Sequence, residues 1–190
     1  MSSDERKVRL SKAEASEKLI ASTIELMRDH PIGKISALKI CAHAGLDKMT
    51  VRYCFGSYMN LLLATASTLG RGMADHIHEG IFDMSAYTNP DAKLFGKLVT
   101  FVFASLGDHM PDVPLEQLPS FVLLEKQITE TYGIDPELAR AMAKRTALVA
   151  VATAAIDHFV PLTERERELL RSVQRLTFIE VAKVQDEILG

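Results

Sequence analysis

Apolar side chains recur at helical spacing wherever the chain shows a clear pattern. An apolar stripe over residues 19–27 predicts a first helix that ends near Pro31, because proline disrupts a helix interior. From Leu170 to Ile188 apolar residues recur at intervals of three and four, which predicts one long final helix over 163–189. No stretch alternates apolar and polar residues as a half-buried strand does, and the sequence contains no Asn-Gly or Asp-Gly turn. The fold class predicted is all-α.

Capping signals mark where other helices begin. Asn-Pro-Asp at 89–91 and Asp-Pro-Glu at 135–137 each combine a side-chain cap, a proline at the first helical position and an acidic first turn. Thr163 and Glu166 have the spacing of a capping box at the start of the final helix. The Asp-Pro-Glu signal at 135–137 predicts a helix over 137–160, and this helix is rich in alanine.

The final helix is long for a chain of 190 residues to cover by itself, at about 40 Å. Its apolar seam and the alanine-rich helix before it predict half of a two-fold four-helix interface, and so a homodimer. The alternative is that the seam packs inside one subunit.

The strongest local signal lies between Ser36 and Leu62. Ser36 is suited to cap a short helix, and Gly45 is suited to end it, because the residue after a helix often needs a positive φ that glycine adopts freely. The side chains of this helix expected to face the interior are Leu38, Ile40, Cys41 and Ala44.

A second short helix is expected over 48–54, with Asp47 as its cap and with Val51 and Phe55 pointing inward. Two short helices joined through one glycine make a helix-turn-helix, whose second helix presents side chains to a DNA major groove about 12 Å wide. The side chains left to face outward are Lys48, Met49, Thr50, Arg52 and Tyr53.

Residues 19–27 and 36–62 resemble the N-terminal domain of the tetracycline-repressor (TetR) family. After an apolar first helix, that family shows a pattern close to S-x-x-x-I-A-x-x-A-G-V-S-x-x-T-x-Y-Y-H-F-x-S-K-x-x-L-L. The matching positions here are Ser36, Ile40, Ala44, Gly45, Leu46, Thr50, Tyr53, Phe55, Ser57, Leu61 and Leu62. The resemblance implies a three-helix helix-turn-helix domain over 1–57, joined to a helical ligand-binding and dimerisation domain over 58–190.

The resemblance also implies partners and roles. A homodimer of this family binds a palindromic double-stranded DNA operator and releases it when a small-molecule inducer enters the C-terminal domain. Lys48, Thr50 and Tyr53 match positions that the family uses near DNA phosphates and bases. Ser36 begins the first motif helix, where backbone amides can meet a phosphate.

Four positions depart from the family pattern. Arg52 replaces a tyrosine and can contact phosphate or read guanine, and Tyr58 replaces a lysine but keeps a hydroxyl that can donate to phosphate. Met49 replaces a small residue and either holds the recognition helix farther from the groove floor or contacts a thymine methyl. Asp47 places a negative charge near the DNA backbone. The expected DNA-binding residues are therefore Ser36, Lys48, Met49, Thr50, Arg52, Tyr53 and Tyr58.

Charge adds modest support for a nucleic-acid partner. The whole chain has a formal net charge of −3, but residues 1–60 carry 10 Lys and Arg against 7 Asp and Glu. A basic front can approach a polyanion that the acidic remainder repels. The N-terminal arm, with Arg6, Lys7, Arg9 and Lys12, either reaches the duplex or is a solvated tail.

The composition is that of a globular protein, with 47% hydrophobic residues, and two cysteines cannot staple a chain of this length. The N-terminus is too polar for a secretory signal, and the longest apolar stretch, 147–156, is about half of what a bilayer requires. We therefore expect a cytoplasmic protein with no membrane partner.

The region after the helix-turn-helix contains apolar and aromatic residues suited to bind a small hydrophobic molecule, with histidines to orient it. The candidates are Met73, His76, Phe103, His109, Met110, Phe121 and Leu124. No cluster has zinc-site spacing, and no phosphate loop, nucleophile elbow or dinucleotide fingerprint occurs, so no metal, cofactor or enzymatic activity is expected.

Two other functions are compatible with parts of this sequence. A homodimer on the same scaffold could bind a small molecule or a protein after losing operator recognition, which Asp47, Met49 and Tyr58 would motivate. A helical enzyme would need a cluster of acid and base residues that the sequence does not show.

Overall fold

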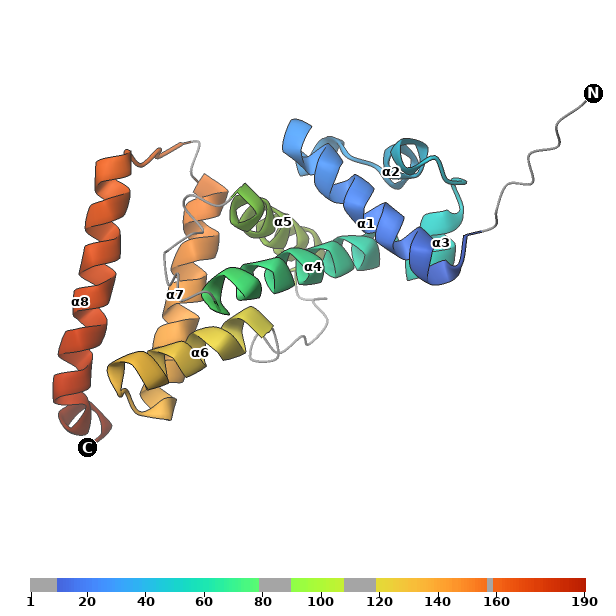
Figure 1. The fold of residues 1–190 in the computed structure, drawn as a ribbon. Helices are drawn as coiled ribbons and strands as arrows, with labels where there is room; N and C mark the ends of the chain where they lie inside the picture. Colours follow the sequence, from blue (N-terminus) through green and yellow to red (C-terminus); the bar gives the residue numbers. More distant parts are fainter. Residues whose placement is uncertain (1–9, 79–89, 108–118, 157–158) are drawn as a thin grey trace, which may run out of the picture. The chain divides into compact units, whose positions relative to one another are not determined.

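The computed structural model describes residues 10–78, 90–107, 119–156 and 159–190 (Figure 1). These residues form eight α-helices and one short 3₁₀ turn, and no strand occurs among them, so the predicted all-α class is confirmed. The helices are α1 (Lys12–Asp29), α2 (Ala37–Ala44), α3 (Thr50–Phe55), α4 (Tyr58–His78), α5 (Pro90–Leu106), α6 (Pro119–Tyr132), α7 (Pro136–Ile156) and α8 (Glu164–Leu189).

The packing divides the chain into two compact units, residues 1–65 and 66–190. The division falls inside α4, whereas the boundary expected from the sequence, between 57 and 58, falls at the start of that helix. One continuous helix therefore contributes its first turns to one unit and the remainder to the other.

In the first unit α1, α2 and α3 pack against one another around a small core. Leu19 of α1 and Ile40 of α2 are completely buried, and Val51 is the buried residue of α3. Thr23 is buried as well, and its hydroxyl donates to the Leu19 carbonyl at 2.7 Å, which satisfies the polar group inside the core.

A capping box fixes the start of α1. The Ser11 amide donates to Glu14 Oε2 at 2.7 Å, and the Glu14 amide donates to Ser11 Oγ at 3.2 Å. Hydrogen bonds from the Ser11 side chain and amide lower the pKa of Glu14, because they favour its charged form. Because the cap fixes the first turn of α1, it also fixes the backbone of Lys12, the first residue of the helix.

The second unit is built around α7, which packs closely against α5 and α6. One buried cluster joins α6 and α7 to α8 and to the loop between α6 and α7. Its members are Phe121, Leu124, Ile128, Ile134, Ala139, Met142, Ala143 and Phe178. Gln185 of α8 holds that loop from the side, accepting from the Asp135 amide at 2.8 Å and donating to the Gly133 carbonyl at 3.2 Å.

Gly96 of α5 marks the closest approach of α5 and α7. A Cβ at this position would overlap the Cβ of Ala154 on α7. Glycine is required here by the separation of the two helices, and its φ is not positive.

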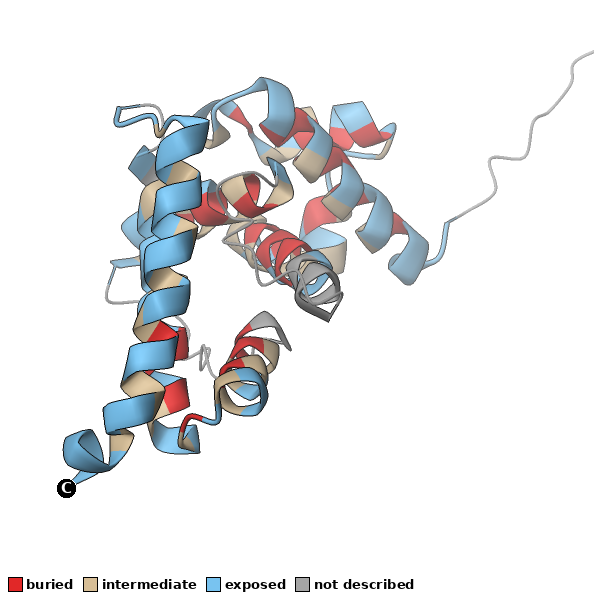
Figure 2. Cartoon of the chain, turned by 60° about the vertical axis from the view of Figure 1, so that its left-hand side comes forward, coloured by how far each residue is buried: buried red, intermediate tan, exposed pale blue. Residues whose placement is uncertain are grey.

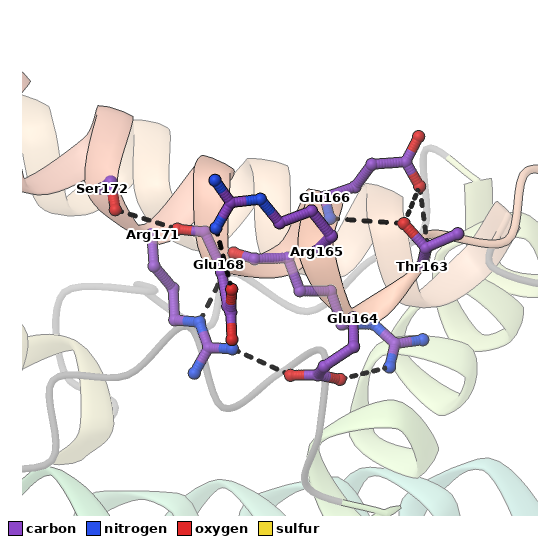
Figure 3. Close-up of polar contacts among 8 residues, drawn as sticks. Thr163, Glu164, Arg165, Glu166, Glu168, Arg171 and Ser172 are labelled. Atoms are coloured by element: carbon purple, nitrogen blue, oxygen red, sulfur yellow. Dashed lines mark hydrogen bonds and ion pairs between the residues drawn. The ribbon is translucent and has the colours of Figure 1, made fainter.

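The predicted capping box of the final helix is confirmed (Figure 3). The Thr163 amide donates to Glu166 Oε2 at 2.7 Å, and the Glu166 amide donates to Thr163 Oγ1 at 3.3 Å. Bonds from the Thr163 amide and hydroxyl lower the pKa of Glu166. The carboxylate of Glu164, the first residue of α8, accepts hydrogen bonds from Arg171 Nη2 at 2.9 Å and from Arg167 Nη1 at 3.2 Å.

The helix expected over 137–160 ends earlier, at Ile156. The amides of Phe159 and Val160 both donate to the Ile156 carbonyl, at 2.8 and 3.1 Å, so the chain turns before Pro161. The prediction of its start is confirmed, with Pro136 at the first helical position and the Glu137 amide donating to Asp135 Oδ1 at 2.8 Å.

Candidate nucleic-acid interface

The turn between α2 and α3 is built as the sequence predicts. Ser36 caps α2, accepting from the Lys39 amide at 3.2 Å. Gly45 ends the helix in the left-handed region, with φ of 64°, and its amide donates to Ala42 while the Leu46 amide donates to Cys41 at 2.8 Å. This pair of bonds is the Schellman arrangement, which reverses the chain tightly and sends it toward α3.

The second helix of the motif is shorter than expected. Asp47 Oδ1 accepts from the Met49 amide at 2.8 Å and the Asp47 carbonyl accepts from the Thr50 amide at 2.9 Å, which makes a turn through Lys48 and Met49. The helix therefore begins at Thr50 rather than at Lys48 and extends to Phe55. The expectation that Asp47 caps this helix is therefore wrong: its carboxylate closes the preceding turn, and α3 begins after Met49 with no side-chain cap.

The face of α3 expected to read DNA is exposed. Val51 is 3% exposed and points into the core, whereas Met49 and Tyr53 are 53% and 68% exposed. Lys48 and Arg52 are exposed beside them, and Thr50 is half-buried. Cations, one aromatic ring and one thioether thus share a single accessible surface, a mixture suited to phosphates and base edges.

Leu38 of α2 was expected to face the protein interior, and this prediction is wrong. It is 63% exposed, while Ile40, Cys41 and Ala44 are buried. At 3.6 residues per turn Leu38 lies about 100° around the helix from the side that those three residues share, so the helix turns it outward.

The start of α1 adds a cation to this surface. Lys12 Nζ lies 5.7 Å from the centre of the Tyr53 ring, and the Cys54 thiol donates to the Lys12 carbonyl at 3.9 Å. Lys12 was expected to belong to the N-terminal arm, and no local spacing signal links it to Tyr53, because the two lie on different helices. The other cations of that arm, Arg6, Lys7 and Arg9, lie outside the described residues.

Tyr58 is engaged inside its own unit. Its hydroxyl donates to the Ile35 carbonyl at 2.7 Å, and burial raises the pKa of Tyr58 above its usual 10.0. The hydroxyl has one proton, so the phosphate contact expected of Tyr58 has no donor while this bond holds. The bond instead ties the start of α4 to the residue before Ser36.

Three of the residues expected to bind a ligand, Phe103, Phe121 and Leu124, have side chains that the structure describes. Phe121 and Leu124 belong to the buried cluster of the second unit, and Phe103 of α5 is 41% exposed. Met73 and His76 lie on α4, but their side chains fall outside the description, and His109 and Met110 lie in the undescribed segment 108–118.

Within the described ranges, no group of three or more His, Cys, Asp and Glu side chains is placed to hold a metal ion. A search of the same residues for a helix long and apolar enough to cross a bilayer finds none.

Comparison with known proteins bears on the fold. Neither models of protein families nor curated proteins match the sequence. Among solved structures, the chain is similar to AlkX of Dietzia sp. strain DQ12-45-1b, a TetR family repressor implicated in biodegradation of n-alkanes. The two chains share 15% identity, the match covers 94% of this chain and 98% of AlkX, and the TM-score is 0.50.

The chain has the fold of a TetR family repressor. The likeness covers almost the whole chain, whereas the sequence resemblance is confined to the N-terminal helices. The likeness in fold therefore extends to the helical region after residue 62, where the sequence itself shows no resemblance beyond helix content and length.

Proposed function

We propose that this chain is a ligand-responsive transcriptional regulator, a cytoplasmic repressor that binds a palindromic DNA operator as a homodimer. The observation that carries the proposal is the exposed face of α3, held in a helix-turn-helix by the Gly45 turn. The TetR fold supports the same reading, because a helix-turn-helix unit is joined in it to a separate helical unit.

The exposed side chains of the helix-turn-helix have functional groups suited to direct contacts with DNA. Arg52 has the donors to contact phosphate or the O6 and N7 atoms of guanine, and exposed Met49 offers an apolar contact for a thymine methyl. Lys48 and Lys12 supply charge to phosphates, and the Ser36 end of α2 supplies backbone amides. Thr50 and Tyr53 complete the predicted surface.

The α7 and α8 helices support dimerisation. Phe178 is the buried residue of α8, and exposed residues occur along almost the entire length of this helix (Figure 2). The large apolar side chains exposed on the two helices are Leu148, Val149, Ile156, Leu169, Leu170, Val173, Leu176, Ile179, Val184, Ile188 and Leu189. Covering each half-exposed side chain is worth about 1 kcal/mol, enough in sum to stabilise a two-fold four-helix interface.

Release of DNA is assigned to a small hydrophobic molecule bound in the second unit. A ligand changes the DNA affinity only if it binds one arrangement of the two recognition helices better than another. The residues proposed to line its site remain Met73, His76, Phe103, His109, Met110, Phe121 and Leu124. We propose no enzymatic activity and no cofactor.

The test uses in vitro selection from random duplex DNA, followed by affinity measurements on the selected sequence. If each subunit neutralises about 3 to 5 phosphates, log affinity falls with log salt at a slope of roughly −5 to −9 for the dimer. Arg52→Ala should weaken binding by about 1–3 kcal/mol per half-site. Arg28→Ala is the matched control, because it removes the same charge from the last turn of α1, about 24 Å along that helix from Lys12. A complex insensitive to salt would contradict the proposal.

A second candidate is a homodimer on this scaffold that binds a small molecule or a protein without recognising DNA. The observation that favours it is the Tyr58 bond to Ile35, which leaves the position of a family lysine without a donor for phosphate. Under this alternative the selection yields no enriched sequence, and Arg52→Ala changes no binding property.

A further inference from the structure

One arginine stands unpaired in the middle of an exposed apolar stripe. Positions 141, 145, 148, 149, 152 and 156 lie on one side of α7 and are all exposed. Five of them are alanine, leucine, valine or isoleucine, and the sixth is Arg145. Among the described residues, Arg145 has no hydrogen bond or ion pair. Its neighbours on the stripe provide no acceptor side chain for the guanidinium.

An unpaired acceptor lies in the groove that Arg145 borders. The groove, about 130 Å³ in volume, runs between α7 and α8 and is lined by Arg145, Thr146, Gln174 and Phe178 among others. Gln174 Nε2 donates to Thr146 Oγ1 at 3.2 Å, but Gln174 Oε1 is buried and accepts no bond. A buried acceptor without a donor destabilises the structure that contains it, because the lost hydrogen bonds to water are not replaced.

The position of the two residues along their helices matters. Arg145 lies next to the midpoint of α7 (Pro136–Ile156), and Gln174 lies within a turn of the midpoint of α8 (Glu164–Leu189). A two-fold interface that buries the full length of both helices has its axis near their midpoints, because any other position leaves one end of each helix uncovered. Residues at this level of one subunit therefore meet residues at the same level of the other.

We propose that a second copy of this chain places its Arg145 in the groove and donates a hydrogen bond to Gln174 Oε1, while the first copy does the same in return. This inference rests on the homodimer of the proposed function and names the polar contact that fixes its register. Each bond supplies the donor that Gln174 lacks and the acceptor that Arg145 lacks, so both unpaired groups of a subunit are satisfied by one symmetric contact.

Size and surroundings favour a second copy over a small molecule. Cavities for drug-sized ligands measure about 300–1,000 Å³, whereas this groove has the volume of about four water molecules and suits a single side-chain head group. Its rim carries Val149, Leu170 and Val173, which are 44%, 38% and 59% exposed and belong to the apolar face that a dimer covers. A single buried polar contact within an apolar helical interface is a known way to specify register.

The test measures the dimer dissociation constant of the full chain by sedimentation velocity for wild type, Arg145→Ala, Gln174→Leu and the double variant. Each single change should weaken the dimer about tenfold, because it leaves one partner unpaired. The double variant should also be about tenfold weaker rather than a hundredfold, because both changes remove the same bond. Arg175→Ala is the control: it removes an equal charge next to Gln174 but lies about 160° around α8 from Val173, and it should leave the constant unchanged.

Several results would contradict the proposed contact between Arg145 and Gln174. Independent effects that multiply in the double variant, or a dimer unaffected by Arg145→Ala, would show that the two residues do not meet. The same comparison can be made with Glu180→Gln on α8 in place of Gln174→Leu. If the effects of Arg145→Ala and Glu180→Gln on the dissociation constant are not independent, the arginine has another acceptor. A wild-type chain that is monomeric at every concentration would refute the homodimer itself, and so the proposed function. Thermal denaturation of each variant separates a weaker interface from an unfolded subunit.

Discussion

The contact between α5 and α7 predicts an unusual response to a glycine-to-alanine change. Alanine is favoured over glycine inside a helix by about 1 kcal/mol, so Gly96→Ala would stabilise an isolated α5. In the folded chain, however, the new methyl group would overlap the Cβ of Ala154, and it would also lie 3.5 Å from the Val151 carbonyl oxygen. The neighbours on α7 are the Ala154 methyl group and backbone atoms, and neither can rotate away.

The helices must therefore separate, which opens space along the rest of their contact. Overpacking of this kind costs about 1–3 kcal/mol, and a direct overlap of two Cβ atoms belongs at the upper end. After the gain in helix propensity is subtracted, we expect Gly96→Ala to lower the free energy of unfolding by about 1–2 kcal/mol.

The assay is urea denaturation followed by circular dichroism at one fixed protein concentration, because dimerisation makes the midpoint depend on concentration. Gly72→Ala on α4 is the matched control: a Cβ there meets no atom within 4 Å, so this change should stabilise the chain by about 0.5–1 kcal/mol. The double variant Gly96→Ala with Ala154→Gly exchanges the two residues and should return to within about 1 kcal/mol of wild type. If Gly96→Ala stabilises the chain as Gly72→Ala does, the close approach of α5 and α7 is refuted.

Three further predictions concern hydrogen bonds. Tyr58→Phe should lower stability by about 1 kcal/mol in the same denaturation assay, because the Ile35 carbonyl loses its donor, and unchanged stability would argue against that bond. Gln185→Leu should cost about 1–3 kcal/mol by leaving the Asp135 amide and the Gly133 carbonyl without their partner, and hydrogen exchange at Asp135 should accelerate; an unchanged exchange rate would contradict it. The pKa of Glu166 is lowered in the folded chain, so its capping bonds stabilise α8 above pH 4.5 and are lost as pH falls through the folded pKa. Glu166→Gln keeps a capping side chain that does not titrate, and its thermal midpoint should fall less than that of wild type between pH 5 and pH 3; equal falls would show that the box does not contribute.

Signals within a few residues of one another predicted much of this fold. The left-handed Gly45, the Ser36 cap, the prolines that begin α5 and α7, and the Thr163 capping box each depend on local backbone geometry, which short sequence patterns encode. The outward face of α3 followed from the burial of Val51.

Features that depend on where distant segments meet could not be predicted in this way. The Tyr58 bond to Ile35, the Gln185 clamp and the approach of Lys12 to Tyr53 each join elements that no spacing rule connects. Leu38 was misplaced because a short helix offers few residues with which to fix its phase, and α3 was predicted too long because the Asp47 turn accounts for two of the expected helical residues.

The central claim is that paired α3 helices read DNA, and selection from a random duplex library tests it most directly. We expect an enriched inverted repeat whose half-sites are centred about 34–36 Å apart, or a multiple of that distance, as two copies of one recognition helix require. Enrichment that Arg52→Ala abolishes and Arg28→Ala preserves would assign the contact to α3. A library that emerges from repeated rounds without an enriched sequence, while the protein remains folded and dimeric, would contradict the account.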